Sequence, residues 1–508
     1  MNELTISRFR SALLSGVTTC EAVTKFYLSR ILTYDKTLRA IITTNPEALE
    51  EARRKDAMLS ARASGTLDAD LPPLHGVPII LKDTYATASM PTTAGSISLR
   101  SLRTNEDAHV VQRLRAAGAI ILAKANLHEF SLQGITVSSL GGQTLNPYDR
   151  TRTPGGSSGG TAAALAANMG LVGCGGDTMN SLRSPASACG VVGFRPSRGQ
   201  ISKRGTVPVT MAQDTLGPMA RTVEDVRILF EIMRGPDVED QITLDERRKY
   251  DTTSTSSNAK TTSHINPVRH GGKIRIGVLG NYFDSDGTND PEIYILNETI
   301  QSALEKSYSF AELIHLSVPE FDTNALLSTV DVQSYEFRTA IDSFLQSRII
   351  IPESTPHRSL ASIAASGEYM HEAMTPPFFE SLQTDVFNTS SLGYLERLQR
   401  IETLKKKLGE CFEENELGAL VYPHQRRLVV RVGEKAQSGR NGILAALTGT
   451  PAVCIPAGFS PPTETAPLGV PIGIEFLGRP WKDFALLDIA ERFEGVLQAR
   501  REPALTMD

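Results

Sequence analysis

Residues that could carry out catalysis gather in three short segments of this 508-residue chain. Lys82 ends the apolar run PIILK, Ser157 lies in the glycine-rich loop PGGSSGGT, and Ser181 lies in a second loop, GGDTMNSLRSPAS. Burial lowers the pKa of a lysine from about 10.4 towards neutrality, and a neutral lysine can activate a serine nucleophile. The segments therefore suggest serine catalysis with a lysine base. The alternative is that Lys82 simply pairs with Asp83 at the end of its strand.

Other catalytic patterns are missing or incomplete. The glycine-rich loop lacks the GK[ST] ending of a P-loop, and no GxSxG elbow surrounds the serines. Taken alone, GGSSGG is also typical of a flexible turn. The nine histidines form no HExxH motif and the five cysteines form no CxxC pair, so we expect no metal site and no cofactor. The neighbouring residues His128 and Glu129 are expected to be structural.

Six segments in this order resemble the motifs of the amidase signature family, and Ser181 follows Ser157 by 24 positions. The segments are GVPIILKD (76–83), NPYDRTRTPGGSSGGTAAALAA (146–167), GGDTMNSLRSPASACGVVGFRPSRGQIS (175–202), DTLGPMARTVEDV (214–226), GRNGILAALTGTPAVCIPAGF (439–459) and GVPIGIEFLGRPW (469–481).

This resemblance implies an amidase that uses a Ser–cis-Ser–Lys triad and an acyl-enzyme intermediate. Lys82 matches the base, Ser157 the bridging serine whose preceding peptide is cis, and Ser181 the nucleophile. Further roles are implied for the surrounding loop residues. The backbone N–H groups expected to form the oxyanion hole belong to Thr178, Met179, Asn180 and Ser181. The residues expected to fix the loops are Ser158, Asp177 and Arg183.

The chain departs from the family at Met179 and Asn180, because the family usually has two glycines directly before the nucleophile. Glycine reaches positive φ freely, asparagine at moderate cost and methionine poorly. If the loop needs a left-handed residue, Asn180 is the expected place. The two side chains also predict a narrower pocket and slow hydrolysis of generic amides.

Two alternative functions remain open at this stage. The first is the A-type subunit of a tRNA-dependent amidotransferase, which acts with partner subunits; the GRPW segment is more typical of stand-alone amidases. The second is a catalytically impaired, amidase-like binding protein, which the Met179–Asn180 departure suggests. Intact Lys82, Ser157 and Ser181 favour an active enzyme.

The elements that position these residues alternate between helix and strand, which is typical of an α/β fold. Helices are expected over 5–60, 107–117, 158–168, 291–306, 325–348, 392–415, 439–449 and 482–497. Strands are expected at HGVPIILKD, AIILAK, LVGCG, GVVGF, KIRIGVLG, ALVYP, PAVCIPAG and PIGIEFLG. The resemblance implies one large amidase-signature fold, a central mixed twisted β-sheet covered by helices on both faces.

We expect a single amidase domain over 1–508. It would comprise an N-terminal helical segment (1–65), the signature core (76–230), a flexible Ser/Thr-rich insertion (251–272) and the remainder of the fold (273–508). The segments that vary in the family, roughly 280–420 and 128–145, are expected near the acyl pocket, so the sequence does not name the substrate.

Composition limits the partners. The net charge is -5 and the pI near 6.1, which argues against nucleic-acid binding driven by positive charge. No apolar run reaches the length of a membrane span, and the scattered cysteines fit a reducing compartment. We therefore expect a cytoplasmic protein that binds neither nucleic acid nor membrane. The family resemblance implies a small-molecule amide as its substrate, and we expect a monomer or homodimer.

Overall fold

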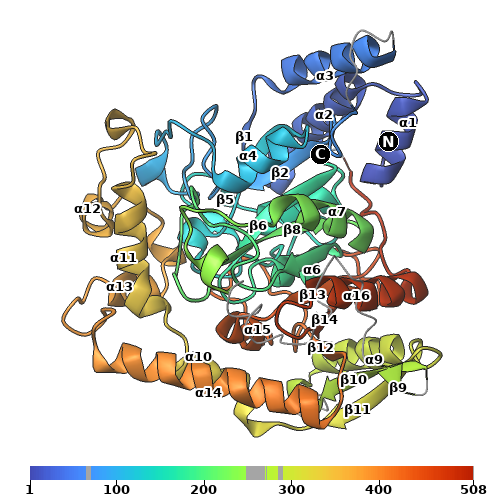
Figure 1. Cartoon of the computed structure of the whole chain (residues 1–508), viewed down its shortest axis with the longest axis vertical. Helices are drawn as coiled ribbons and strands as arrows, with labels where there is room; N and C mark the ends of the chain where they lie inside the picture. Colours follow the sequence, from blue (N-terminus) through green and yellow to red (C-terminus); the bar gives the residue numbers. More distant parts are fainter. Residues whose placement is uncertain (64–69, 247–268, 271, 284–289, 507–508) are drawn as a thin grey trace.

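A mixed β-sheet runs through the molecule and takes strands from both halves of the chain (Figure 1). The computed structural model describes residues 1–63, 70–246, 269–270, 272–283 and 290–506. The strand order is β1-β3-β2-β6-β8-β7-β13-β14-β12-β10-β11, and β9 pairs with β10. Parallel pairs such as β2–β3 and β2–β6 occur together with antiparallel pairs such as β6–β8 and β13–β14.

The strands of this sheet are β1 (Ile41–Thr44), β2 (Pro78–Lys82), β3 (Ile120–Ala125), β6 (Val172–Asp177), β7 (Val192–Arg195), β8 (Thr215–Ala220), β9 (Arg269–His270), β10 (Lys273–Leu279), β11 (Ala311–Leu316), β12 (Ala419–Pro423), β13 (Ala452–Phe459) and β14 (Pro471–Leu477). A separate pair consists of β4 (Val137–Ser138) and β5 (Gly142–Gln143).

The α-helices of the described ranges are α1 (Ile6–Leu14), α2 (Cys20–Leu38), α3 (Ala48–Ala63), α4 (His109–Ala116), α5 (Gly159–Ala166), α6 (Arg183–Cys189), α7 (Val223–Met233), α9 (Pro291–Glu305), α10 (Thr323–Thr329), α11 (Gln333–Leu345), α12 (Leu360–Ser366), α13 (Pro376–Glu380), α14 (Leu392–Glu414), α15 (Ile443–Thr448) and α16 (Asp483–Leu497). None of the described helices is both long enough and apolar enough to cross a bilayer.

Helices cover both faces of the sheet, as strand β14 makes clear. Phe476 packs against Phe493 of α16, with ring centroids 4.6 Å apart. A Cβ added to the nearby Gly473 would lie 2.6 Å from Ser187 Oγ of α6. Because successive side chains of a strand point to opposite faces, α6 and α16 lie on opposite sides. Helix α5 packs beside α6, and α7 packs beside α16. The α5–α6 face carries both serine loops.

The expected α/β class and helix-covered mixed sheet are confirmed, with local corrections. The region 5–60 is not wholly helical: its β-branched run IITT forms β1, which pairs with β3 after Arg39 leaves the helix at φ 52°. The region 325–348 is two helices, α10 and α11. The elements that were not anticipated include strands β8 and β11 and helices α6, α7, α12 and α13. Most of the expected insertion, 251–268 and residue 271, lies outside the described residues.

Gly160 offers a direct test of how closely α5 approaches the sheet. A Cβ there would lie 2.2 Å from the carbonyl oxygen of Asn126 and 2.6 Å from that of Ala40. Because both atoms are backbone, Gly160→Ala should cost about 1–3 kcal/mol or more and lower Tm in a thermal scan. The matched control is Gly409→Ala in α14, where no atom lies within 4 Å. Removing this helix glycine should instead stabilise by about 0.5–1 kcal/mol. Equal Tm changes for both variants would contradict the packing described here.

Candidate active site

Lys82 and Ser157 meet in the interior, where β2 ends beside the start of α5. All five residues of β2 are buried, and the exposed fractions of Lys82 and Ser157 are 1% and 0%. Lys82 Nζ donates a hydrogen bond to Ser157 Oγ at 2.7 Å. The peptide bond between Gly156 and Ser157 is cis. The structure thus brings together two of the three expected triad residues by a direct contact.

The alternative pairing of Lys82 with Asp83 is wrong. Asp83 points to the opposite face of β2 and forms an ion pair with Lys124 Nζ of β3 at 2.7 Å. Its other carboxylate oxygen accepts a hydrogen bond from the backbone N–H of Thr93 at 3.1 Å. Lys82 is therefore left with a hydroxyl, and not a carboxylate, as its hydrogen-bond partner.

Burial controls the protonation of Lys82. Removal from water disfavours the ammonium form and lowers the pKa of Lys82 to about 7, although the negative charges of Asp214 and Asp177 oppose this shift. A large fraction of Lys82 is consequently neutral near pH 7, and a neutral amine can accept a proton. The sequence-based expectation that the apolar run would depress this pKa is confirmed in direction.

Ser181 lies between the end of β6 and the start of α6, with an exposed fraction of 6%. Its carbonyl oxygen accepts a hydrogen bond from the N–H of Ser158 at 3.2 Å, so the backbones of the two serine loops are joined. The Ser181 hydroxyl has no hydrogen-bond partner among the described residues, and it does not hydrogen-bond to Ser157. Ser181 therefore lies on a loop joined to that of Ser157, and its hydroxyl makes no hydrogen bond with a described residue.

The loop before Ser181 is held by its carbonyl groups. Those of 177, 178 and 179 accept hydrogen bonds from Arg195 (2.6 Å), Gln213 (3.5 Å) and Arg183 (2.5 Å). The carbonyl of Asn180 accepts from the N–H groups of α6. In a trans peptide the N–H points away from the C=O. The N–H groups of 178–181 accordingly point the other way, and none has an acceptor within the described ranges.

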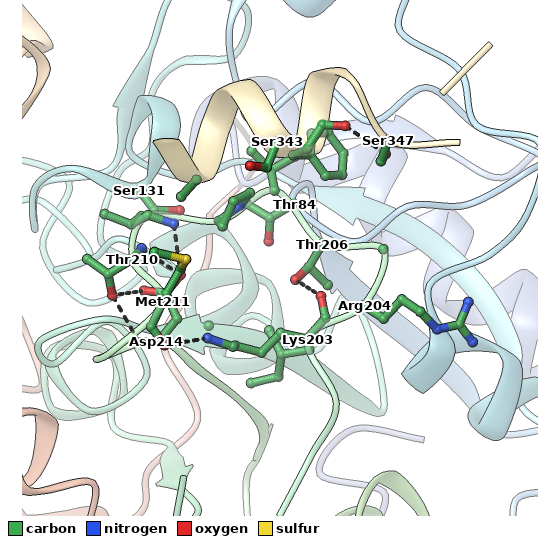
Figure 2. Close-up of a pocket in the computed structure, with 18 of the residues that line it drawn as sticks. Thr84, Ser131, Lys203, Arg204, Thr206, Thr210, Met211, Asp214, Ser343 and Ser347 are labelled. Carbon is green, nitrogen blue, oxygen red and sulfur yellow. Dashed lines mark hydrogen bonds between the residues drawn. The ribbon is translucent and has the colours of Figure 1, made fainter. Parts of the chain in front are cut away.

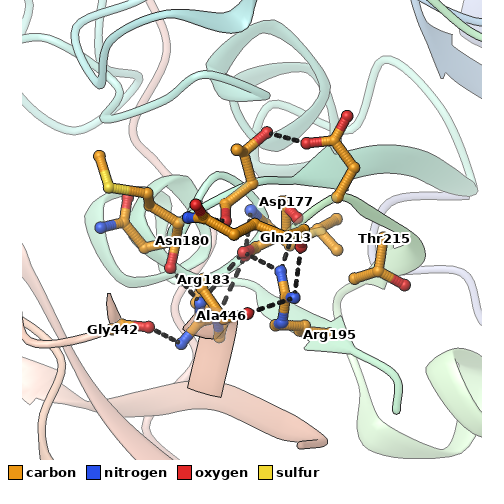
Figure 3. Close-up of polar contacts among 12 residues, drawn as sticks. Asp177, Asn180, Arg183, Arg195, Gln213, Thr215, Gly442 and Ala446 are labelled. Atoms are coloured by element: carbon orange, nitrogen blue, oxygen red, sulfur yellow. Dashed lines mark hydrogen bonds and ion pairs between the residues drawn. The ribbon is translucent and has the colours of Figure 1, made fainter. Parts of the chain in front are cut away.

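A buried ion network fixes these arginines (Figure 3). Asp177 forms ion pairs with Arg183 at 3.0 Å and Arg195 at 2.8 Å, and Arg183 also pairs with Glu475 of β14. Burial alone would raise the pKa of Asp177, but the two guanidinium groups outweigh it and hold that pKa well below its usual range. Asp177 also accepts from the N–H of Leu182 at 3.0 Å, so the network orients the chain on both sides of Ser181.

Ser158 joins the loops from the other side. Its hydroxyl donates to the carbonyl oxygen of Gly176 at 3.2 Å and accepts from the N–H of that residue at 3.3 Å. The three residues expected to fix the loops, Ser158, Asp177 and Arg183, all lie where they can do so. Their effect on catalysis stays a prediction.

Neither Met179 nor Asn180 has a positive φ, so this loop does not need a left-handed residue at either place. Met179 packs against a hydrophobic cluster that includes Ile443 and Leu444 of α15. Asn180 Oδ1 accepts a hydrogen bond from Arg440 Nη1 at 3.0 Å. Both side chains thus have defined neighbours in place of the two glycines, and the expected narrowing of the pocket stays a prediction.

A cavity of about 390 Å³ reaches Lys82 and residues 176–178 from outside. Figure 2 shows Ser343 and Ser347 across this cavity from Lys203 and Asp214. Its apolar lining residues include Val207, Val209, Leu216, Ala340, Phe344 and Ile349. Of the segments expected near the acyl pocket, 128–145 contributes Ser131 to this cavity, and 280–420 contributes residues of α11 and those that follow it. The contribution of 203–216 was not anticipated, and the identity of this cavity as the acyl pocket stays a prediction.

Several site residues escaped the sequence analysis although some carry a signal. Arg195 and Glu475 are single charges inside the otherwise apolar strands VGFR and PIGIEFL, a pattern that indicates a buried partner. Arg440 belongs to the quoted segment 439–459 and lies just before α15, but no pattern in that segment marks its side chain as a site residue. His128 and Glu129 contact backbone atoms of Ala373 and Ser139. No cluster of three or more His, Cys, Asp or Glu suited to a metal ion occurs within the described ranges.

Comparisons with known proteins agree on one family. The family model described as Amidase matches residues 22–487. The chain is 31% identical to the A-type subunit of the glutamyl-tRNA(Gln) amidotransferase of Symbiobacterium thermophilum, over 99% of each chain. It resembles the native peptide amidase of Stenotrophomonas maltophilia with a TM-score of 0.83 and 29% identity, over 100% of this chain and 99% of that one. An amidase family protein from Bacillus anthracis gives a TM-score of 0.79 and 27% identity, over 99% and 93%.

Proposed function

The chain belongs to the amidase signature family, and on this premise we propose that it hydrolyses a small-molecule carboxamide through an acyl-enzyme on Ser181. The observation that carries the proposal is the buried hydrogen bond between Lys82 Nζ and Ser157 Oγ. It places a lysine of lowered pKa against a serine whose loop is joined to that of Ser181.

In the proposed reaction, neutral Lys82 takes the proton of Ser157, and Ser157 takes that of Ser181. Ser181 Oγ then attacks the amide carbonyl carbon. When the C–N bond breaks, the relay returns the proton to the leaving nitrogen, which departs as ammonia or an amine. Water next attacks the acyl ester with the same relay as its base, and it releases the carboxylic acid and the free serine.

The backbone N–H groups of 178–181 are suited to stabilise the tetrahedral intermediate. They have no acceptors among the described residues, and the carbonyl groups of the same peptides are anchored on the opposite side. Donors fixed before the reaction need no reorganisation when negative charge develops on the oxygen, and each is typically worth 100- to 1,000-fold in rate. Because these donors are backbone, Met179 and Asn180 are compatible with this role.

The cavity beside Lys82 is proposed to hold part of the substrate, since it begins at 176–178 and its walls are largely apolar. The likeness to the A-type subunit of an amidotransferase supports a second candidate, the A-type subunit of a tRNA-dependent amidotransferase that works with partner subunits. Purification of the tagged chain from its own cells distinguishes the two. A stand-alone amidase would release ammonia from amides by itself, whereas a subunit would require co-purified partners for full activity.

Ser181→Ala tests the nucleophile. It removes one hydroxyl that has no described partner, so the fold should persist while ammonia release falls by about 1,000-fold or more. The matched control is Ser184→Ala in α6, which deletes another buried hydroxyl that makes no hydrogen bond with the described residues and should retain turnover. Wild-type turnover by Ser181→Ala would show that another group attacks the amide.

The pH profile tests the base. Because the reaction needs neutral Lys82 and its pKa is about 7, kcat/KM should fall about tenfold per pH unit below pH 7 and level off above it. Lys82→Arg should be inactive at every pH, since a guanidinium stays protonated. Thermal scans at each pH exclude unfolding as the cause. A profile that stays flat from pH 8 down to pH 5 would rule out Lys82 as the base.

A further inference from the structure

Arg440 stands apart from the other arginines that surround Ser181. Its guanidinium donates through Nη1 to Asn180 Oδ1 at 3.0 Å and through Nη2 to Gln133 Oε1 at 3.0 Å. Both acceptors are neutral amides. Arg183 and Arg195, by contrast, are ion-paired with Asp177.

The charge of Arg440 is partly buried and has no counter-ion in the described part of the chain. No carboxylate there lies within ion-pair distance of its guanidinium, and burial lowers its pKa to about 10, against the pull of Asp177. A charge taken out of water without a partner is costly, and proteins normally neutralise it. A partner that arrives with the substrate would remove this cost only when the site is occupied.

The position of Arg440 connects it to both serine loops. Asn180, labelled in Figure 3, directly precedes Ser181. Gly134 lies under the guanidinium, because a Cβ there would be 2.3 Å from Arg440 Nη1. Gly134 also touches the loop of Ser157, since a Cβ on Gly156 would be 3.0 Å from the Gly134 carbonyl carbon. The guanidinium therefore lies next to the segments that carry the proposed bridging serine and nucleophile.

Once Arg440 has bonded to the amide oxygens of Asn180 and Gln133, the nitrogen groups left free on these three side chains are all hydrogen-bond donors. A guanidinium cannot accept a hydrogen bond, so the amide oxygens of Asn180 and Gln133 must face Arg440. Their nitrogens, Asn180 Nδ2 and Gln133 Nε2, are left as donors without acceptors among the described residues, as are the remaining N–H groups of Arg440. A positively charged set of donors suits a planar anion such as a carboxylate.

We propose that Arg440, together with Asn180 and Gln133, binds a carboxylate carried by the amide substrate close to the scissile bond. The substrate class is then an amide with a free carboxylate, such as the half-amide of a short dicarboxylic acid. The inference rests on the proposed amidase function and deepens it. It also gives Asn180 a purpose, because a glycine at this position would offer Arg440 no amide and the carboxylate no donor.

Binding of product-like acids tests the inference without any turnover. Calorimetry with the Ser181→Ala protein compares succinate with 4-methylpentanoate, in which an isopropyl group replaces the second carboxylate. Succinate should bind more tightly, and Arg440→Gln in the same background should weaken succinate by about 10- to 100-fold while changing 4-methylpentanoate little. Asn180→Gly should weaken succinate less. The control, Arg431→Gln, changes an exposed arginine that contacts Thr151 and should not alter binding.

Steady-state kinetics then distinguish recognition of the substrate carboxylate by Arg440 from a purely structural role of this residue. With the active enzyme, Arg440→Gln should lower kcat/KM for succinamate at least tenfold more than for 4-methylpentanamide, mainly through KM. Equal losses on both amides would mean that Arg440 only braces the loops, and equal binding of the two acids by Ser181→Ala would also overturn the inference. If the second carboxylate tightens binding through Arg440 but no amide is hydrolysed, the carboxylate site stands and the proposed amidase function fails.

Discussion

The uncharged state of one buried lysine is the condition on which the proposed chemistry depends. β2 and β3 each carry a lysine with an exposed fraction of 1% or less, yet their partners differ. Lys124 faces Asp83 and forms an ion pair, whereas Lys82 faces the hydroxyl of Ser157. Burial lowers the pKa of both lysines; at Lys124 the charge and the hydrogen bond of Asp83 oppose this shift, whereas the hydroxyl of Ser157 brings no negative charge to Lys82. The alternation of the strand, which turns Asp83 away from Lys82, thus makes Lys82 available as a base.

The ion network of Asp177, Arg183, Arg195 and Glu475 supplies the second requirement, a loop with a fixed orientation. Its arginines bind the carbonyl oxygens at 177 and 179, so the N–H groups of the same peptides point in the opposite direction. Loss of one partner in such a network is expected to be costly, because it leaves an uncompensated buried charge. Since the network acts through the backbone, side chains can replace glycines at 179 and 180 without disturbing it.

The sequence predicted best what short local patterns encode. The apolar run before Lys82 indicated a buried lysine, and alternating helices and strands indicated the α/β class. The sequence did not predict contacts between residues that are far apart in the chain. The ion pair of Asp83 with Lys124, for example, depends on which strands are neighbours in the sheet, and a single sequence does not give the strand order. The single charges Arg195 and Glu475 could have been noticed within apolar strands. Arg440 could not, because its distinguishing feature is that it forms no ion pair with any described residue of the folded molecule.

The protonation state of Lys82 can be measured directly by NMR on protein labelled with ¹³C and ¹⁵N at the lysine side chains. The Lys82 signal is identified by its loss in Lys82→Met, and its chemical shift is followed from pH 5 to pH 11. The account predicts a midpoint near 7, in agreement with the effect of burial. A midpoint near the ordinary lysine value of about 10.4 would mean that Lys82 is charged at neutral pH and would contradict its role as the base.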